Sequence, residues 1–185
     1  MRRIVNSTYI TLDGVIEHPE TWPDTGVAGD GTGLRVQTDL LFGCDAVLMG
    51  RRTYDGFAPV WMTRSGDPYS DRINSMTKYV VSHTLRDPEW ANTTVLAGAD
   101  IADQLAALKQ QDGQDIVQYG IGPVTRVLLE HDLLDELRLW VHPLLLGHGQ
   151  PDDLLFRPGR TTHWDVADTT VLNTGIVIIT YRPHR

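Results

Sequence analysis

The amino-acid sequence predicts an α/β fold, in which a mostly parallel sheet is flanked by helices and ends in an antiparallel hairpin. Patterns typical of strands and of helices alternate along nearly all of the 185 residues. The run over residues 45–49 is almost entirely apolar, as in a strand that is covered on both faces of a parallel sheet. Two strand patterns near the end of the chain flank Asn173-Thr174-Gly175, a sequence typical of a hairpin turn.

The composition is that of a globular protein that can bury a full core, and we expect one domain over residues 1–185. The formal net charge is −8 and the sequence has no run rich in Lys and Arg, which argues against nucleic-acid binding. Cys44 is the only cysteine, so no intramolecular disulfide can form. The chain begins without the apolar core of a signal peptide and has no apolar run of the ~20 residues that span a bilayer. We therefore expect a cytoplasmic protein that does not enter membranes.

The first part of the chain predicts two strands and two helices around a long loop. Polar and apolar residues alternate over residues 2–10, as in a strand, and a loop with several Gly and Pro residues follows over residues 11–30. Long loops in compact domains are usually functional. Apolar residues recur at helical spacing over residues 34–42. The buried strand over residues 45–50 then leads directly into a helix over residues 51–57.

The rest of the chain continues this alternation. We predict further strands over residues 78–82, 93–97, 115–119 and 135–143, the last of which is stopped by a proline. Two helices, over residues 101–110 and 123–129, follow the second and third of these strands. The hairpin strands cover residues 164–172 and 176–182.

The most informative motif is Gly120-Ile121-Gly122, where a predicted strand turns directly into a helix. Glycines let backbone amides approach a phosphate closely, and the first helical turn presents unpaired N–H donors at the positive end of its dipole. Pro123 suits this first turn, where its missing N–H has no cost. A strand-to-helix turn also needs glycine for steric reasons alone, so the motif by itself leaves both interpretations open.

Two other strand ends carry groups that can bind phosphate. Gly50-Arg51-Arg52-Thr53 opens a helix with backbone amides, two guanidinium groups and a hydroxyl. Ser82-His83-Thr84 follows the next predicted strand. Because open α/β sheets bind ligands beyond the carboxyl ends of their strands, three such ends favour a dinucleotide. The alternative is that Arg51 and Arg52 are solvated and that Thr53 only caps the helix.

The long loop adds a carboxylate and aromatic rings to the candidate site. Asp13, followed by Gly14, can orient a substrate or relay a proton, although Asp-Gly is also a common turn pair. Trp22 and Trp61 can form apolar walls around a planar ligand, or they can belong to the core or to a lid. Histidines and glycines occur together over residues 142–149 without a clear third ligand, so we expect no metal site.

Together these segments resemble the dihydrofolate reductase-like superfamily, and more closely its branch that contains the reductase domain of the bifunctional riboflavin-biosynthesis protein, the RibD C-terminal domain. The resemblance covers most of the chain. The segments that carry it are Thr11-Leu12-Asp13-Gly14, Leu48-Met49-Gly50-Arg51-Arg52-Thr53-Tyr54, Tyr79-Val80-Val81-Ser82, Gly120-Ile121-Gly122, and Leu133-Leu134-Asp135-Glu136-Leu137-Arg138-Leu139 leading to Pro143 and Leu146-Gly147-His148-Gly149.

The resemblance implies a three-layer dihydrofolate reductase-like fold and NADPH as the cofactor. It places Arg51 or Arg52 at the 2′-phosphate. The residues that it places near the adenosine phosphates are Gly50, Arg51, Arg52, Thr53, Ser82 and His83. Those that it places at the pyrophosphate are Gly120, Ile121, Gly122, Pro123, Val124 and Thr125. Asp13 is implied as the catalytic carboxylate where nicotinamide and substrate meet, and the substrate or lid residues are Gly14, Trp22, Tyr54 and Trp61.

One departure from the superfamily bears on the substrate. Folate reductases carry an acidic residue in the helix after the long loop, whereas residues 33–37 contain none, Asp30 is too early and Asp39 is too late. The resemblance therefore implies an NADPH-dependent reductase that transfers hydride to a small polar acceptor rather than to folate. The reaction expected is similar to that of 5-amino-6-(5-phosphoribosylamino)uracil reductase.

Two other interpretations remain open. The chain can be a non-catalytic nucleotide-binding protein that keeps the fold without the chemistry, or a structural homodimeric protein that binds no nucleotide. The apolar strands and the hairpin can support a homodimer, which we expect, but apolar residues of a core and of an interface look alike in a sequence. The other expected partner is a small-molecule substrate.

Overall fold

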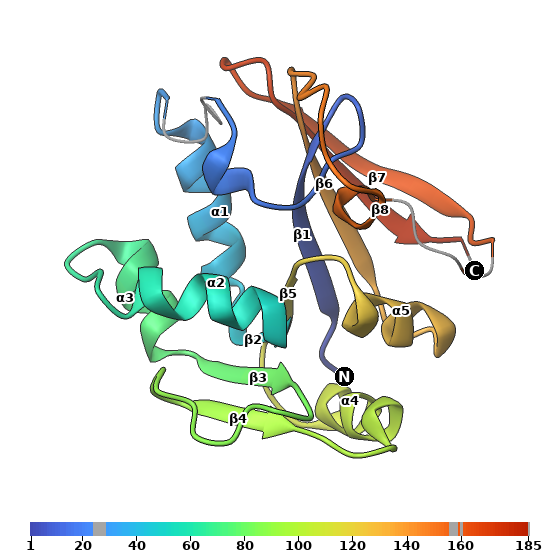
Figure 1. Cartoon of the computed structure of the whole chain (residues 1–185). Helices are drawn as coiled ribbons and strands as arrows, with labels where there is room; N and C mark the ends of the chain where they lie inside the picture. Colours follow the sequence, from blue (N-terminus) through green and yellow to red (C-terminus); the bar gives the residue numbers. More distant parts are fainter. Residues whose placement is uncertain (24–28, 156–158, 160, 185) are drawn as a thin grey trace.

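A computed structural model describes residues 1–23, 29–155, 159 and 161–184 of the protein. Its eight-stranded sheet has the strand order β4-β3-β2-β5-β1-β6-β8-β7 (Figure 1). The strands are β1 (Ile4–Thr11), β2 (Cys44–Gly50), β3 (Thr77–Val81), β4 (Thr93–Leu96), β5 (Asp115–Tyr119), β6 (Glu136–His142), β7 (Trp164–Val171) and β8 (Val177–Pro183). In this order, the strands β4, β3, β2, β5, β1 and β6 run parallel to one another. Strands β8 and β7 add an antiparallel hairpin at the side of β6. This arrangement confirms the predicted fold class.

Helices cover both faces of the sheet and make three layers (Figure 1). The helices are α1 (Thr32–Phe42), α2 (Arg51–Trp61), α3 (Pro68–Ser75), α4 (Ile101–Gln110) and α5 (Pro123–Glu130), with short 3-10 turns η1 (Pro19–Thr21) and η2 (Pro151–Asp153). On one face, Val117 packs in a cluster with Leu41 of α1 and Ile73 of α3. On the other face, Ile116 packs with Leu128 of α5. Neighbouring residues of β5 thus serve opposite layers, as the period of two in a strand requires.

Helix α3 is the element that the sequence pattern did not predict. Asp67 caps it by accepting a hydrogen bond from the backbone N of Ser70 at 2.9 Å, and Pro68 occupies its first turn. Its buried apolar residues are Tyr69 and Ile73. Two apolar positions in eight residues give too weak a period for a prediction, although both start signals are present in the sequence.

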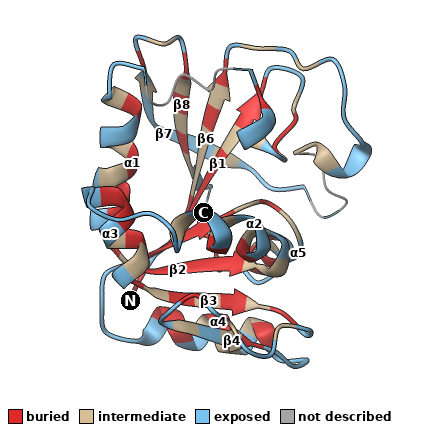
Figure 2. Ribbon diagram, turned by 60° about the vertical axis from the view of Figure 1, so that its left-hand side comes forward, coloured by how far each residue is buried: buried red, intermediate tan, exposed pale blue. Residues whose placement is uncertain are grey.

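The loops that carry the candidate site all leave the same edge of the sheet. Because β1, β2, β5 and β6 run parallel, their carboxyl ends lie together, and residues 12–23, 51–53, 120–122 and 143–155 follow them. Figure 2 shows buried residues concentrated in the central strands and mostly exposed residues along β7. Within the described residues, no helix combines the length and the apolar character needed to cross a bilayer.

Candidate functional site

Two helices begin side by side at the carboxyl edge of the sheet. Helix α2 starts after Gly50 and α5 after Gly122, so neither N-cap residue has a side chain that could cap the first turn, and Oγ1 of Thr125 accepts a hydrogen bond from the backbone N of Gly122 at 3.4 Å. A Cβ atom at Gly50 would lie 3.4 Å from Cγ2 of Val124, and one at Gly120 would lie 2.5 Å from Oγ1 of Thr53. Gly120 also has a φ of +80°, which favours glycine. The glycines therefore bring the first turns of both helices, with their amide donors, to one place.

A buried polar network holds the Gly120 turn from below. The side-chain amides of Asn6 and Gln118 both donate to the carbonyl oxygen of Gly120, that of Asn6 at 3.1 Å. The hydroxyl of Thr125 donates to the same oxygen at 3.2 Å. In a trans peptide the N–H points away from the C=O, so the N–H of Ile121 faces away from this network. The network thus fixes the orientation of a backbone donor at the predicted pyrophosphate position.

Sequence reasoning missed Asn6 and Gln118. Both are fully buried polar residues in central strands. The side-chain amide of Asn6 donates to Oε1 of Gln118, which is 112 residues away in the sequence, and both amides donate to the turn. The signal in the sequence is an amide side chain within a predicted central strand, because an amide that is buried there must find partners. The sequence does not show which partners those are.

Arg51 faces the end of β3. Its Nε donates to Oδ1 of Asp55 at 2.8 Å, and its Nη1 donates to the hydroxyl of Thr84 at 3.2 Å. Oγ of the buried Ser82 accepts a hydrogen bond from the backbone N of Thr84 at 3.2 Å, while His83 is exposed. The structure thus brings Arg51 together with the segment that follows β3.

Arg52 points the other way, toward the loops that follow β1 and β6. Its guanidinium nitrogens lie 3.7 Å from Oε1 of Glu17 and 3.8 Å from Oδ1 of Asp153. Its Nη2 also lies 3.3 Å from Nε2 of His18. The Arg52 side chain is 58% exposed, so water screens these pairs and each contributes at most about 1 kcal/mol. The two arginines lie toward opposite sides of the helix starts.

Asp13 is bound to a neighbouring loop. Its carboxylate accepts hydrogen bonds from the hydroxyl of Thr11 at 2.5 Å and from the backbone N of Gly147 at 2.8 Å and of Leu146 at 3.3 Å. These donors, above all the Thr11 hydroxyl, lower the pKa of Asp13 to about 2. Asp13 is therefore ionised at neutral pH, a state that suits orienting an acceptor and not donating a proton. Its catalytic role, and the role of the adjacent Gly14 as a substrate or lid residue, stay predictions.

Three aromatic residues that were predicted as substrate or lid residues pack among other side chains. Trp22 is buried and lies edge-on to the ring of His142, with the ring centroids 5.5 Å apart. Tyr54 is buried in the core between α2 and the sheet. Trp61 lies at the far end of α2, and its ring centroid is 5.0 Å from that of Tyr69. Contact of these rings with a ligand stays a prediction.

Three tyrosines, not predicted as site residues, lie on the face of the sheet that α1 and α3 cover. The hydroxyl oxygens of Tyr69 and Tyr119 are 3.1 Å apart, and the side-chain amide of Gln37 donates to the hydroxyl of Tyr9. Burial raises the pKa of Tyr69 to about 12, and it raises the pKa values of Tyr9 and Tyr119 further. All three hydroxyls are therefore protonated and neutral at physiological pH.

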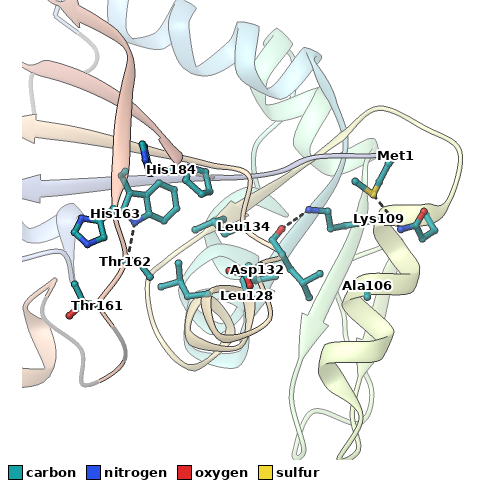
Figure 3. Close-up of a pocket in the computed structure, with 15 residues that line it drawn as sticks. Met1, Ala106, Lys109, Leu128, Asp132, Leu134, Thr161, Thr162, His163 and His184 are labelled. Carbon is teal, nitrogen blue, oxygen red and sulfur yellow. Dashed lines mark hydrogen bonds between the residues drawn. The ribbon is translucent and has the colours of Figure 1, made fainter.

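The opposite edge of the sheet contains a cavity of about 620 Å³ (Figure 3). Leu128, Leu134 and Trp164 form part of its wall, beside the buried Lys109. The predicted site residues all lie within the described part of the chain, and none of them lines this cavity. No group of three or more His, Cys, Asp or Glu residues within that part is arranged to hold a metal ion.

Residues 2–178 match the model of the RibD C-terminal domain. The chain belongs to the RibD C-terminal domain family. This confirms the resemblance that the sequence motifs indicated and places the chain in a riboflavin-pathway reductase-like family. As a RibD C-terminal domain it is similar to the uncharacterized protein YyaP of Bacillus subtilis (strain 168), with 29% identity over 185 residues that cover 97% of this chain and 94% of YyaP.

Solved structures share the fold of this RibD C-terminal domain. A putative riboflavin biosynthesis protein from Shewanella sp. PV-4 superposes with a TM-score of 0.68 and 24% identity over 100% of both chains. RibD of Acinetobacter baumannii gives a TM-score of 0.65 and 18% identity, with 100% of this chain and 58% of that chain covered. The deaminase/5-amino-6-(5-phosphoribosylamino)uracil reductase of Thermotoga maritima gives a TM-score of 0.66 and 17% identity, with 99% of this chain and 57% of that chain covered. The chain thus spans somewhat more than half of these last two proteins.

Proposed function

We propose that the protein is an NADPH-dependent reductase that transfers hydride to a small polar acceptor, in a reaction resembling that of 5-amino-6-(5-phosphoribosylamino)uracil reductase. The observation that carries the proposal is the meeting of two helix starts whose N-cap residues are glycines, with Gly120 against Thr53. Such starts supply amide donors and positive dipole ends for a pyrophosphate. Membership of a reductase-like family supports the same reaction class.

The residues at the helix starts fit the cofactor. A Cβ at Gly122 would meet no atom within 4 Å, so this side of the turn is open to a phosphate, while Gly120 is held from below. We assign Arg51 and Thr84 to the adenosine end, because a guanidinium fork and a hydroxyl suit a 2′-phosphate. We assign Arg52 to the pyrophosphate end. When bound, NADPH supplies the hydride, and the protein supplies orientation and binding.

The polar groups buried beneath α1 are neutral. Tyr9 and Tyr119 carry protonated hydroxyls, and Gln37 carries an amide, on the face that α1 covers. Asp39, the carboxylate of α1, is exposed. We therefore propose a pyrimidine-ribosylamine or a related carbonyl or imine compound, with Asp13 orienting it through a hydroxyl or a water, and not a folate.

We also propose that the protein is a homodimer. Strand β7 ends the sheet, and within the described residues only β8 pairs with it. Val166 and Val171 on this strand are 60% and 69% exposed. An unpaired strand edge can add a strand from a second copy. Light scattering after size exclusion tests this: twice the chain mass of 20.7 kDa is expected, and 20.7 kDa alone refutes it.

The cofactor proposal is tested by titrating the protein with NADPH while fluorescence quenching and thermal stabilisation are followed. We expect saturable binding below millimolar concentrations, loss of binding in Gly120→Val and retention in Gly66→Val. Gly66 has a φ of +87° with no atom within 4 Å of a built Cβ, so it controls for backbone strain. No binding at millimolar NADPH would refute the proposal.

The reaction is tested with the same protein by following NADPH oxidation with pyrimidine, pterin and carbonyl acceptors. Oxidation with a pyrimidine or carbonyl acceptor and not with a pterin is expected. Binding without oxidation of any acceptor would support the alternative, a non-catalytic nucleotide-binding protein with this fold.

A further inference from the structure

Two loops that follow different strands form a single flap at the carboxyl edge of the sheet. We call residues 12–22 and 144–155 the flap. Val15 and Leu154 form an antiparallel bridge, and the backbone N of Leu155 donates to the carbonyl of Gly14 at 2.8 Å. The blue loop after β1 and the orange segment around η2 lie side by side in Figure 1. Segments that are about 140 residues apart therefore form one unit.

One side of the flap is attached to the protein by neutral packing and by hydrogen bonds to backbone amides. Asp13 accepts from the backbone of Gly147, so it ties the two flap segments together near their bases. Trp22 is buried against His142 of β6, and its Nε1 donates to the carbonyl of Glu17 at 3.0 Å. The ring contact of Trp22 holds the flap to β6, and a hydrogen bond from the backbone N of Val15 to the hydroxyl of Thr11 at 3.0 Å holds it to β1.

The other side of the flap is attached to α2 by charge. Glu17 comes from the first flap segment and Asp153 from the second, and both carboxylates face the guanidinium of Arg52 at 3.7 and 3.8 Å. Each carboxylate is about one-fifth exposed, whereas Arg52 is largely exposed. At these distances the ion pairs lack the short, forked hydrogen bonds that arginine makes with a phosphate.

This contact crosses the position proposed for the pyrophosphate. Strand β5 lies between β2 and β1, so an arginine at the end of β2 reaches the loop after β1 across the end of β5. The end of β5 is the Gly120 turn, beside the helix starts. Ile121 of this turn packs in one cluster with Ile16 and Leu155 of the flap, so the carboxylates of Glu17 and Asp153 lie near the turn. They repel an incoming phosphate as long as they stay there.

We propose that Glu17 and Asp153 are positioning residues that hold Arg52 in a latch, and that a phosphate of the dinucleotide displaces them from the guanidinium and frees the flap. The inference rests on the proposed cofactor. Carboxylates and phosphate compete for the guanidinium of Arg52, so the latch weakens cofactor binding. Cofactor binding in turn releases the flap from α2, which opens the carboxyl edge of the sheet to an acceptor.

The affinity test compares wild type with Glu17→Gln in NADPH titrations at low and high salt. We expect Glu17→Gln to tighten binding about threefold at low salt, since one repulsive charge and one competing pair are removed. The gain should shrink as salt increases. Glu130→Gln, which removes an exposed carboxylate near the end of α5, is the matched control and should not change affinity. Unchanged or weaker binding in Glu17→Gln overturns the proposal.

The flap itself is tested by amide hydrogen exchange of residues 12–22 and 144–155. Arg52→Gln should speed exchange in both segments severalfold. Arg51→Gln is the control: it removes the same charge, but from a side chain that pairs with Asp55 and not with the flap, so it should not speed exchange. NADPH should speed flap exchange in wild type. Unchanged exchange in Arg52→Gln, or slower exchange with NADPH, overturns the latch. If wild type binds no NADPH, the proposed function fails, and the Arg52→Gln exchange alone decides whether the latch exists.

Discussion

The two edges of the sheet use charge in opposite ways. At the amino edge the charges that matter most are buried: Lys109 and Asp135 are 5% and 10% exposed and in direct contact, and the fully buried Glu136 carboxylate pairs with arginines that are between 25% and 58% exposed. At the carboxyl edge the pairs of Arg51 and Arg52 are exposed, and those of Arg52 are long.

The difference separates charges that hold the fold from charges that are available to a ligand. A buried pair cannot be opened without leaving an uncompensated charge, which costs several kcal/mol. An exposed pair costs at most about 1 kcal/mol to break, so a bound phosphate can replace it. Ligand binding can therefore rearrange charges at the carboxyl edge with little loss of free energy. At the amino edge, including the cavity there, the same rearrangement would cost several kcal/mol.

The largest expected effect is at the amino edge. Asp135→Asn should lower the free energy of unfolding by about 3 kcal/mol, because it leaves the Lys109 ammonium buried with the carbonyl of Leu133 as an acceptor and no charged partner. Asp55→Asn, which breaks the exposed pair with Arg51, should cost less than about 1 kcal/mol. Urea unfolding of both variants measures the contrast, and equal losses would contradict it.

The second effect concerns the turn between the helix starts. Gly120→Ala should destabilise the protein by roughly 2 kcal/mol, since it combines a positive φ with a Cβ that meets Oγ1 of Thr53. It should also weaken NADPH binding about tenfold, or 1.4 kcal/mol. Gly66→Ala has the same sign of φ without the clash and should cost roughly 1 kcal/mol with unchanged affinity. If both variants lost the same affinity for NADPH, the close approach of Gly120 to Thr53 would not matter for binding.

A smaller effect is expected below the turn. Thr125→Val removes the hydroxyl that donates to the carbonyl of Gly120, and should cost about 1 kcal/mol of unfolding free energy. Thr38→Val removes a similar hydroxyl, which donates to the carbonyl of Leu34 on the exposed surface of α1, and should be nearly neutral. Thermal unfolding with and without NADPH separates the stability loss from a loss of binding. A neutral Thr125→Val would mean that the network does not hold the turn.

The smallest effect is at the base of the flap and depends on pH. The Asp13 pKa is lowered from an ordinary 3.8 to about 2, so its ionised form stabilises the folded state above pH 4, and this contribution is lost as the pH falls toward 2. The small difference in unfolding midpoint between wild type and Asp13→Asn should therefore close over that range. Asp168→Asn, on β7, is the control and should show no such closing. A difference that persists at pH 2 would contradict the assignment of the shift to Asp13.

Local patterns in the sequence predicted the fold closely. Strand and helix periods, the Asn-Thr-Gly turn and the apolar run of β2 specified an α/β sheet with a terminal hairpin, which the strand pairing confirms. The period failed at α3, where two buried apolar residues in one short helix carry too little signal. It also placed the end of α2 at residue 57, while the helix continues across Pro59 to Trp61.

Some features of the candidate site could be predicted from local patterns and others could not. The sequence by itself determined that glycines, arginines and hydroxyls stand at the ends of particular strands, because the position of a strand and of the helix after it can be predicted from local periods. Only the tertiary structure decided that Arg52 meets Glu17 and Asp153, and that Asn6 and Gln118 hold Gly120. These contacts depend on β5 lying between β2 and β1, and a strand order set by long-range packing leaves no trace in the local periods of the chain.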